Sequence, residues 1–199
     1  MIRPGFSLTP RADFLSVTCS RDHGALMWDG VSSVLSELPG SSLVSGDLVG
    51  WTLPNSGGFV GFREMRGICK LDTTGSMLVA LSQHNLLGAF LQELGDSPHR
   101  VTRLDACLDS PRSAPPILRR LYSLGRKGKV QLSRKAAPVT RIMAPGLDGV
   151  ETGSVYFGSR RATVQAKAYD KRQERYDKTG VDYGPWTRYE LTVRGQVGA

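Results

Sequence analysis

Cysteine and histidine are scarce in this chain of 199 residues, and neither is spaced for covalent bridging or metal binding. The three cysteines are widely separated, odd in number and free of any CxxC spacing, which argues against a disulfide framework and a zinc knuckle. The three histidines show no HxH or HExxH spacing. We therefore expect reduced, buried thiols and no histidine-based metal chemistry. The residues concerned are Cys19, Cys69, Cys107, His23, His84 and His99.

Long apolar runs are absent as well. The longest, such as SMLVAL and NLLGAFL, are far shorter than the roughly 20 residues of a membrane-spanning helix. The N-terminus, MIRPGFSLTPRADFLSV, lacks the hydrophobic core of a signal peptide, so we expect a cytoplasmic protein without membrane contact. No solenoid-length repeat and no low-complexity segment appears. The 40% apolar content suits an ordinary folded protein, and we expect one continuous domain over residues 1–199.

Basic residues are abundant but unevenly distributed. The formal net charge is +8, yet residues 1–99 contain 6 basic and 9 acidic side chains, whereas residues 100–199 contain 20 basic and 9 acidic ones. A polyanion bound to the second half would release counterions, which is how nucleic acids attract proteins irrespective of sequence. The alternative is a solvated surface that happens to be basic.

Residue patterns in the first half predict two strands, two helices and a hairpin. Alternation and branched residues favour a strand at 13–20, and Asp29 is a candidate N-cap for a short helix that ends at Pro39-Gly40. Residues 40–63 are rich in Gly and Ser and predict a hairpin around PNSGG. The segment 68–81 predicts a strand and a turn, and 82–96 a helix with a Ser cap.

The second half predicts four strands and one helix. The strands are RVTRLDACLDS, GSVYFGS, VQAKAYDK and WTRYELTVR, with the helix APPILRRLYSLGRKGK after the first of them and a basic irregular stretch to about residue 150. This order fits an α+β fold in which helices pack on one face of an antiparallel sheet. Residues 1–99 would then contribute the N-terminal part of the sheet and its helices.

Polar side chains fall on one face of these predicted strands. Side chains alternate between the two faces of a strand, so the apolar positions of 103–109, 164–171 and 186–194 can pack on helices while the polar ones stay together. The structural alternative is a solvated, charge-paired outer face. The polar face collects Asp105, Asp109, Lys167, Tyr169, Lys171, Arg188 and Glu190.

Carboxylates gathered on one face repel each other unless a cation lies between them. Their oxygens suit Mg²⁺ or Mn²⁺, which bind through one or two carboxylates and keep waters for a phosphate. A tyrosine beside such an ion, with lysines to lower its pKa or to hold a phosphate, could attack a phosphodiester as a covalent nucleophile.

Three linked motifs carry a family resemblance. VTRLDACLD, then TGSVYFGSRRATVQAKAYDKRQE, then GPWTRYELTVRG resemble the replication initiation factor family, the Rep trans type of rolling-circle initiators of small plasmids, filamentous phages and integrated elements. The motifs span about residues 100–195, and the N-terminal segments fit more loosely. Members of this family usually continue into a helical C-terminal region, which this sequence, ending at VRGQVGA, does not contain.

The resemblance implies a metal-dependent DNA nickase and strand transferase. Such an initiator binds a double-strand origin, cuts one strand with a tyrosine to leave a 5′-phosphotyrosyl link and a free 3′-OH, and rejoins the ends. The metal ligands of the family would fall on Asp105, Glu190 and Asp109. Lys171 and Arg188 would steady the scissile phosphate. Lys167 stands where the family commonly has Arg, so the bidentate fork is lost.

Four tyrosines compete for the role of nucleophile. Tyr169 ends its strand on the polar face and matches the Tyr-Asp-Lys motif, so we expect it to carry the covalent bond. Tyr176, in the second YDK copy, is a reserve nucleophile in a helical turn or loop. Tyr156 belongs to neither cluster, and Tyr189 should point into the core.

Basic side chains outside the polar face predict further DNA contacts. The turn after Tyr156 is suited to gripping a phosphate through backbone amides and two arginines. The segment 119–141 can track phosphates and become ordered on binding, or be merely a soluble linker. The predicted contacts are Arg160, Arg161, Lys167, Arg119, Arg120, Arg126, Lys127, Lys129, Arg134 and Lys135.

Two other functions remain open at this point. A non-catalytic origin-binding protein or repressor on the same fold would bind DNA in a salt-dependent way without an adduct, and a water-using phosphodiesterase would cleave without a protein-linked product. The partner implied by the resemblance is origin DNA, hairpin or single-stranded at the nick, inside a bacterial host cell. A host helicase and a second copy of the chain are further candidate partners.

Overall fold

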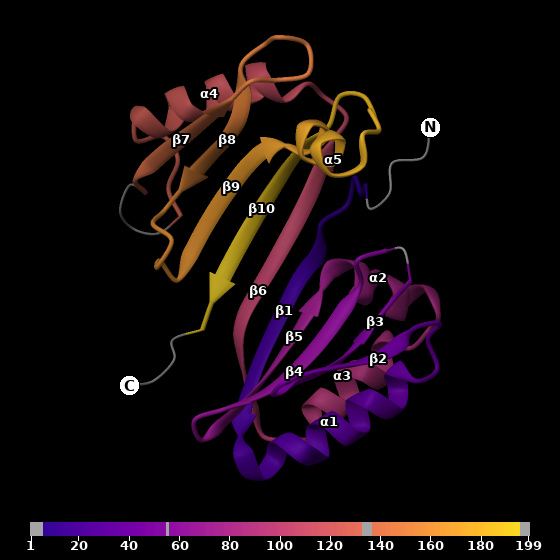
Figure 1. Cartoon of the computed structure of the whole chain (residues 1–199). Helices are drawn as coiled ribbons and strands as arrows, with labels where there is room; N and C mark the ends of the chain where they lie inside the picture. The colour runs from indigo at the N-terminus through magenta and orange to yellow at the C-terminus, as the bar shows by residue number, and fades with distance from the viewer. Residues whose placement is uncertain (1–5, 55, 133–136, 196–199) are drawn as a thin grey trace. The chain divides into compact units, whose positions relative to one another are not determined.

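The chain folds into two compact units. The computed structural model describes residues 6–54, 56–132 and 137–195 (Figure 1). The N-terminal unit comprises Ala12–Leu104 with residues 194 and 195, and the C-terminal unit comprises Asp105–Val193 with residues 6–11. That the whole chain works as a single nicking and DNA-binding domain stays a prediction.

The N-terminal unit contains an antiparallel sheet with the strand order β2-β3-β4-β5-β1-β6. Short hairpins join β2 to β3, β3 to β4 and β4 to β5, so neighbours in sequence are neighbours in the sheet. The strands are β1 (Arg11–Ser20), β2 (Ser41–Ser45), β3 (Leu48–Thr52), β4 (Phe59–Met65), β5 (Ile68–Thr74) and β6 (His99–Ser110), the last of which also supplies residues to the C-terminal unit.

Three helices cover one face of that sheet, namely α1 (Arg21–Leu35), α2 (Gly75–Gln83) and α3 (Leu87–Gly95) (Figure 1). Leu35, Leu71, Leu81 and Phe90 are fully buried between the helices and the strands. Each such side chain contributes about 1.5–3 kcal/mol when it leaves water. The approach of α1 to β5 is close, because a Cβ at Gly24 would lie 2.2 Å from the sulfur of Cys69.

The C-terminal unit contains a second set of antiparallel strands in the order β6-β10-β9-β8-β7. Helix α4 packs Leu118 against Val155, Phe157 and Ala168 on one face. The confirmed fold class is thus a mixed α/β structure with antiparallel sheet. The elements are β7 (Val139–Ala144), β8 (Thr152–Phe157), β9 (Val164–Asp170), β10 (Thr187–Arg194), α4 (Ala114–Arg126) and α5 (Lys171–Thr179).

Most predicted elements are present, but several boundaries were wrong. Helix α1 begins at Arg21, so Asp29 lies inside it and is no N-cap. The segment after β5 forms helix α2, because Met77, Leu78 and Leu81 share a buried helical stripe that a short apolar run does not distinguish from a strand. Ser82 belongs to α2, and the supposedly irregular stretch after α4 contains strand β7.

Burial of the cysteines is confirmed: Cys19, Cys69 and Cys107 are buried free thiols. Cys19 and Cys69 lie opposite each other on β1 and β5, and burial raises the pKa of both thiols. Among the described residues, no helix combines the length and apolar character that crossing a membrane requires.

Candidate active site

The polar face predicted from alternation forms on β9 and β10 of the C-terminal unit. Tyr169 lies opposite Arg188, and Lys167 lies opposite Glu190. Helix α4 packs on the other face, against Ala168 and its neighbours. One side of this sheet is therefore available for polar chemistry.

Tyr169 is at the centre of a hydrogen-bonded group. Its hydroxyl donates to Oε1 of Glu190 at 2.7 Å and accepts from Nζ of Lys171 at 3.2 Å. Nζ of Lys167 lies 3.8 Å from the centroid of the Tyr169 ring and 3.6 Å from Oε2 of Glu190. A carboxylate can thus accept the phenol proton while an ammonium group stabilises the oxygen.

Burial has the largest effect on the pKa of Tyr169. The side chain is 7% exposed, and burial raises the pKa of Tyr169 well above its ordinary value. The negative charges of Glu190 and Glu174 raise it further, because a phenolate beside a carboxylate is unfavourable. Tyr169 is therefore a neutral phenol that donates to Glu190.

Glu174 is a site residue that the sequence reasoning missed. Oε2 of Glu174 accepts from Nζ of Lys171 at 2.6 Å, and its other oxygen accepts from Lys178. Burial opposes ionisation of Glu174, but the hydrogen bonds from the two lysines outweigh it and hold its pKa at about 2. Burial in turn lowers the pKa of Lys171, against the stabilising effect of Glu174. The i,i+3 and i,i+4 spacing to the two lysines was the signal available.

Helix α5 follows β9 directly because Asp170 serves both elements. Its carboxylate accepts the backbone N–H of Gln173 at 3.1 Å as the N-cap of α5, and accepts the Thr152 hydroxyl of β8 at 2.7 Å. The helix ends at Thr179 and is capped by Gly180, whose φ of 68° suits glycine. This cap fixes the positions of Tyr169 and Lys171 on either side of the junction.

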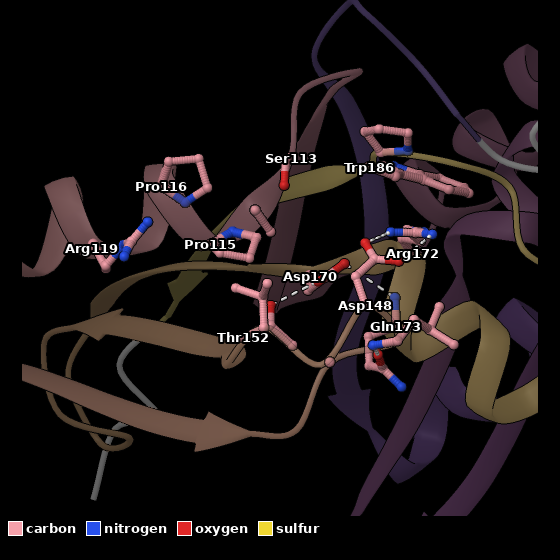
Figure 2. Close-up of a pocket in the computed structure, with 15 residues that line it drawn as sticks. Ser113, Pro115, Pro116, Arg119, Asp148, Thr152, Asp170, Arg172, Gln173 and Trp186 are labelled. Carbon is pink, nitrogen blue, oxygen red and sulfur yellow. Dashed lines mark hydrogen bonds and ion pairs between the residues drawn. The ribbon is translucent and has the colours of Figure 1, made fainter.

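A small cavity of about 140 Å³ lies beside this junction (Figure 2). Figure 2 shows Arg172 reaching across it to Asp148, and the guanidinium also pairs with Asp182 at 2.6 Å. Gln173 accepts the backbone N–H of Leu147 at 2.8 Å. These contacts tie the start of α5 to two loops, so they act on the site by positioning it.

Asp109 is not placed to ligate a metal, which corrects the prediction. Its side chain has no exposure and accepts from Nε of Arg188 at 2.7 Å, from the Trp186 indole at 2.8 Å and from the backbone N–H of Ser7 at 2.9 Å. These hydrogen bonds outweigh the desolvation that opposes ionisation, so the pKa of Asp109 is lowered. Arg188 is itself 4% exposed and bound to Asp109, so its predicted contact with a scissile phosphate is not prepared in this structure.

Asp105 is buried on β6, and Glu190 is on the neighbouring strand β10. Asp105 lies four positions before Asp109, so alternation places it on the face of Arg188 and Glu190. Within residues 6–54, 56–132 and 137–195, no group of three acidic, histidine or cysteine side chains is arranged to hold a metal ion. A complete metal site is thus not formed by these side chains alone.

Most of the predicted DNA contacts are exposed, but they lie in different places. Arg119, Arg120 and Arg126 are on α4, across the sheet from the Tyr169 hydroxyl, and Lys127 and Lys129 follow that helix. The turn after β8 exposes the two arginines predicted there, Arg160 and Arg161, whereas Lys167 belongs to the Tyr169 group. Arg134 and Lys135 lie outside the described residues.

The remaining tyrosines differ from Tyr169 in their surroundings. Tyr176 is on α5 and 39% exposed. Tyr156 is opposite Lys167 on β8, on the polar face. Tyr189 packs against the core of the C-terminal unit, as predicted.

The fold is similar to that of a solved rolling-circle initiator. The solved structure of the rolling circle replication initiator protein from Geobacillus stearothermophilus matches 94% of this chain and 75% of its own, with a TM-score of 0.58 and 20% sequence identity. Residues 99–197 match the family model of the replication initiation factors, and this part of the chain belongs to that family. No curated protein sequence matches the chain.

Proposed function

We propose that the protein initiates rolling-circle replication by nicking and rejoining origin DNA through Tyr169. The observation that carries the proposal is the position of the Tyr169 hydroxyl, which donates to Glu190 and accepts from Lys171. The family match over residues 99–197 supports a role in replication initiation. A chain with this role acts where its DNA is, in the cytoplasm of a bacterial host.

In the proposed reaction the phenol oxygen of Tyr169 attacks a phosphodiester. A bond forms between that oxygen and phosphorus, the phenol proton passes to Glu190, and the bond from phosphorus to the 3′ oxygen breaks. The 3′ oxygen leaves and takes a proton from solvent. The products are a 5′-phosphotyrosyl link and a free 3′-OH, and attack by that 3′-OH on the link reverses the steps and rejoins the strand.

Lys171 and Lys167 supply positive charge where the phosphate would arrive. Lys171 already touches the attacking oxygen, and Glu174 keeps the lysine in place. Lys167 lies over the Tyr169 ring beside Glu190. Charge placed in advance of the reaction stabilises the developing charge of the transition state without reorganisation.

The burial of Tyr169 sets a condition on this reaction. At 7% exposure the phenol is not open to a phosphodiester, so DNA binding has to open the site. Tyr176, at 39% exposure on the adjoining helix, is the reserve nucleophile, available for a second strand cut before the ends are joined.

A divalent cation, Mg²⁺ or Mn²⁺, is part of the proposal. Such ions bind through one or two carboxylates and complete their shell with water and substrate phosphates. Asp105 and Glu190, on one face of adjacent strands, would be the protein's share, and the DNA phosphate would supply the rest. When bound, the ion would neutralise charge on the phosphate.

The direct test is a covalent adduct. Labelled single-stranded origin DNA and Mn²⁺ should give a protein–DNA product that survives denaturation in the wild type and in Tyr176→Phe. The adduct should be lost in Tyr169→Phe, and chelation should abolish it in the wild type and in Tyr176→Phe. An adduct that persists in Tyr169→Phe would sink the assignment, and Tyr156→Phe serves as a control from the same face.

The second candidate is a non-catalytic origin-binding protein on this fold. The raised pKa and burial of Tyr169 favour it, because both suppress nucleophilicity. It predicts salt-dependent DNA binding that is insensitive to chelation and yields no adduct. Cleavage without a protein-linked product would instead indicate a water-using phosphodiesterase.

A further inference from the structure

The N-terminal unit has a groove of about 890 Å³ on the face of its sheet opposite helices α1, α2 and α3. Side chains from β1, β3, β4, β5 and the start of β6 line it, together with His23 at the start of α1. The core positions of β4 and β5, such as Val60 and Leu71, point to the helices, so Phe59, Arg63 and Lys70 point into the groove. None of the DNA contacts predicted from the sequence lies in this unit.

An aromatic ring forms part of the groove floor. Gly50 and Gly61 face each other on β3 and β4. A Cβ at Gly61 would lie 2.3 Å from Cζ of Phe59, and one at Gly50 would lie 3.0 Å from its Cε2. The ring of Phe59 therefore lies over both glycines, in space that larger residues would occupy, and remains partly exposed. Because Gly50 and Gly61 have no side chains, the ring of Phe59 can pack over the backbone of β3 and β4 and present an aromatic surface in the groove.

The groove is basic within an acidic unit. Between Ala12 and Leu104 the sequence has nine acidic residues, but Asp72 alone among them lines the groove, where it pairs with Lys70 at 2.7 Å. Arg63 and Arg100 also line it and are exposed. Within the part of the chain that the structure describes, Arg63 has no acidic partner. Arg63 lies directly opposite Lys70, so the basic side chains run across the strands.

We propose that this groove binds single-stranded DNA, with a base against Phe59 and phosphates at Arg63 and Arg100. An aromatic surface flanked by cations on an open antiparallel sheet is the arrangement that holds unpaired bases, because every base has a face that can stack. A duplex presents its bases already stacked and cannot use Phe59. This proposal rests on the proposed function only in taking DNA as the bound polymer. The groove would hold the single strand that the nick releases from the duplex.

The test uses the full chain in the Tyr169→Phe background, so that covalent linkage does not contribute. An oligothymidine of about 12 nucleotides is titrated by fluorescence anisotropy at several salt concentrations. Phe59→Leu should bind it about 5- to 150-fold more weakly, the loss expected for one stacked base. Arg63→Gln should reduce the slope of log affinity against log salt by about 0.7, the value for one phosphate contact. Arg21→Gln, which removes the same charge from a 70% exposed side chain paired with Glu64, should change neither.

Photocrosslinking locates the contact independently of affinity. An oligonucleotide with 5-iodouracil should crosslink to strand β4, which contains Phe59 and Arg63, and mass spectrometry of the peptides identifies the position. The proposal is overturned if Phe59→Leu binds like Arg21→Gln, if crosslinks fall only in the C-terminal unit, or if duplex competes better than single strand. Thermal melting shows whether Phe59→Leu is folded, and Arg63→Gln tests the groove through an exposed side chain. Failure of the nicking proposal would appear instead as a missing adduct in the wild type with groove binding intact.

Discussion

Replacing Asp109 by Asn should destabilise the chain by about 3–5 kcal/mol, the cost of breaking a buried ion pair on one side. Each carboxylate oxygen of Asp109 accepts two hydrogen bonds: Oδ1 from Arg188 and the Trp186 indole, and Oδ2 from Arg188 and the Ser7 backbone. An asparagine keeps the volume but has one acceptor oxygen, so its amide would face two donors. The 4% exposed guanidinium would also lose its counter-charge.

Urea unfolding followed by tryptophan fluorescence measures this loss. Asp148→Asn is the matched control, because Asp148 is 65% exposed and its partner Arg172 keeps Asp182. We expect that control to cost below about 1 kcal/mol. Asp109→Asn with the stability of the control would refute the assignment of a structural role. Lost metal-dependent nicking at unchanged stability would restore Asp109 as a ligand.

The pH dependence of the free energy of unfolding tests the Asp109–Arg188 pair in a second way. The pKa of Asp109 is lowered in the folded state, so the stabilisation is complete above the unfolded pKa of about 3.9 and is lost as the pH falls through the lower folded value. The stability gap between the wild type and Asp109→Asn should therefore narrow in acid. A gap of constant size from pH 7 to pH 2 would contradict the assigned pKa direction.

Three further predictions follow from single side chains. Glu174 has a folded pKa of about 2, so Glu174→Gln should flatten the fall in stability between about pH 4.3 and pH 2, as urea midpoints measured across that range will show. The difference in ultraviolet titration between the wild type and Tyr169→Phe should show no phenol ionising near the ordinary pH of about 10, and a step there would contradict the raised pKa. Gly24→Ala should lower the free energy of unfolding by about 1–3 kcal/mol, because its Cβ would meet the sulfur of Cys69. Gly88→Ala, in open space on α3, should instead raise it by about 0.5–1 kcal/mol. Equal thermal midpoints for the two variants would refute the close packing of α1 on β5.

The polar face of the sheet was predictable because alternation is a local property of a strand. Tyr169, Lys167 and Glu190 meet as predicted, since the period of two holds along β9 and β10. Lys171 was assigned to the same strand, but Asp170 caps a helix there and the lysine reaches Tyr169 from α5. Lys171 therefore lies beside Tyr169 as expected, but from a helix and not from the predicted strand.

The partner of each charge could not be read from alternation. Asp105 and Asp109 share a face, but the Asp109 carboxylate accepts hydrogen bonds from Arg188 and Trp186 in a buried group. Burial and pairing depend on neighbouring strands and on the Ser7 backbone, about a hundred residues away in sequence. The raised pKa of Tyr169 has the same origin: the lysines beside it were visible in the sequence, but the burial that removes water from the phenol was not.

The Tyr169 side chain is buried and its hydroxyl is hydrogen-bonded to Glu190, which bears on how the protein would select its substrate. If Tyr169 is the nucleophile, then the resting protein is latent, and the substrate itself must supply the free energy that opens the site. A sequence that binds but falls short by about 1.4 kcal/mol would be cut about tenfold more slowly. The protein would then discriminate between DNA sequences by the free energy needed to expose Tyr169 as well as by binding affinity. Other DNA of the host would be bound and left uncut.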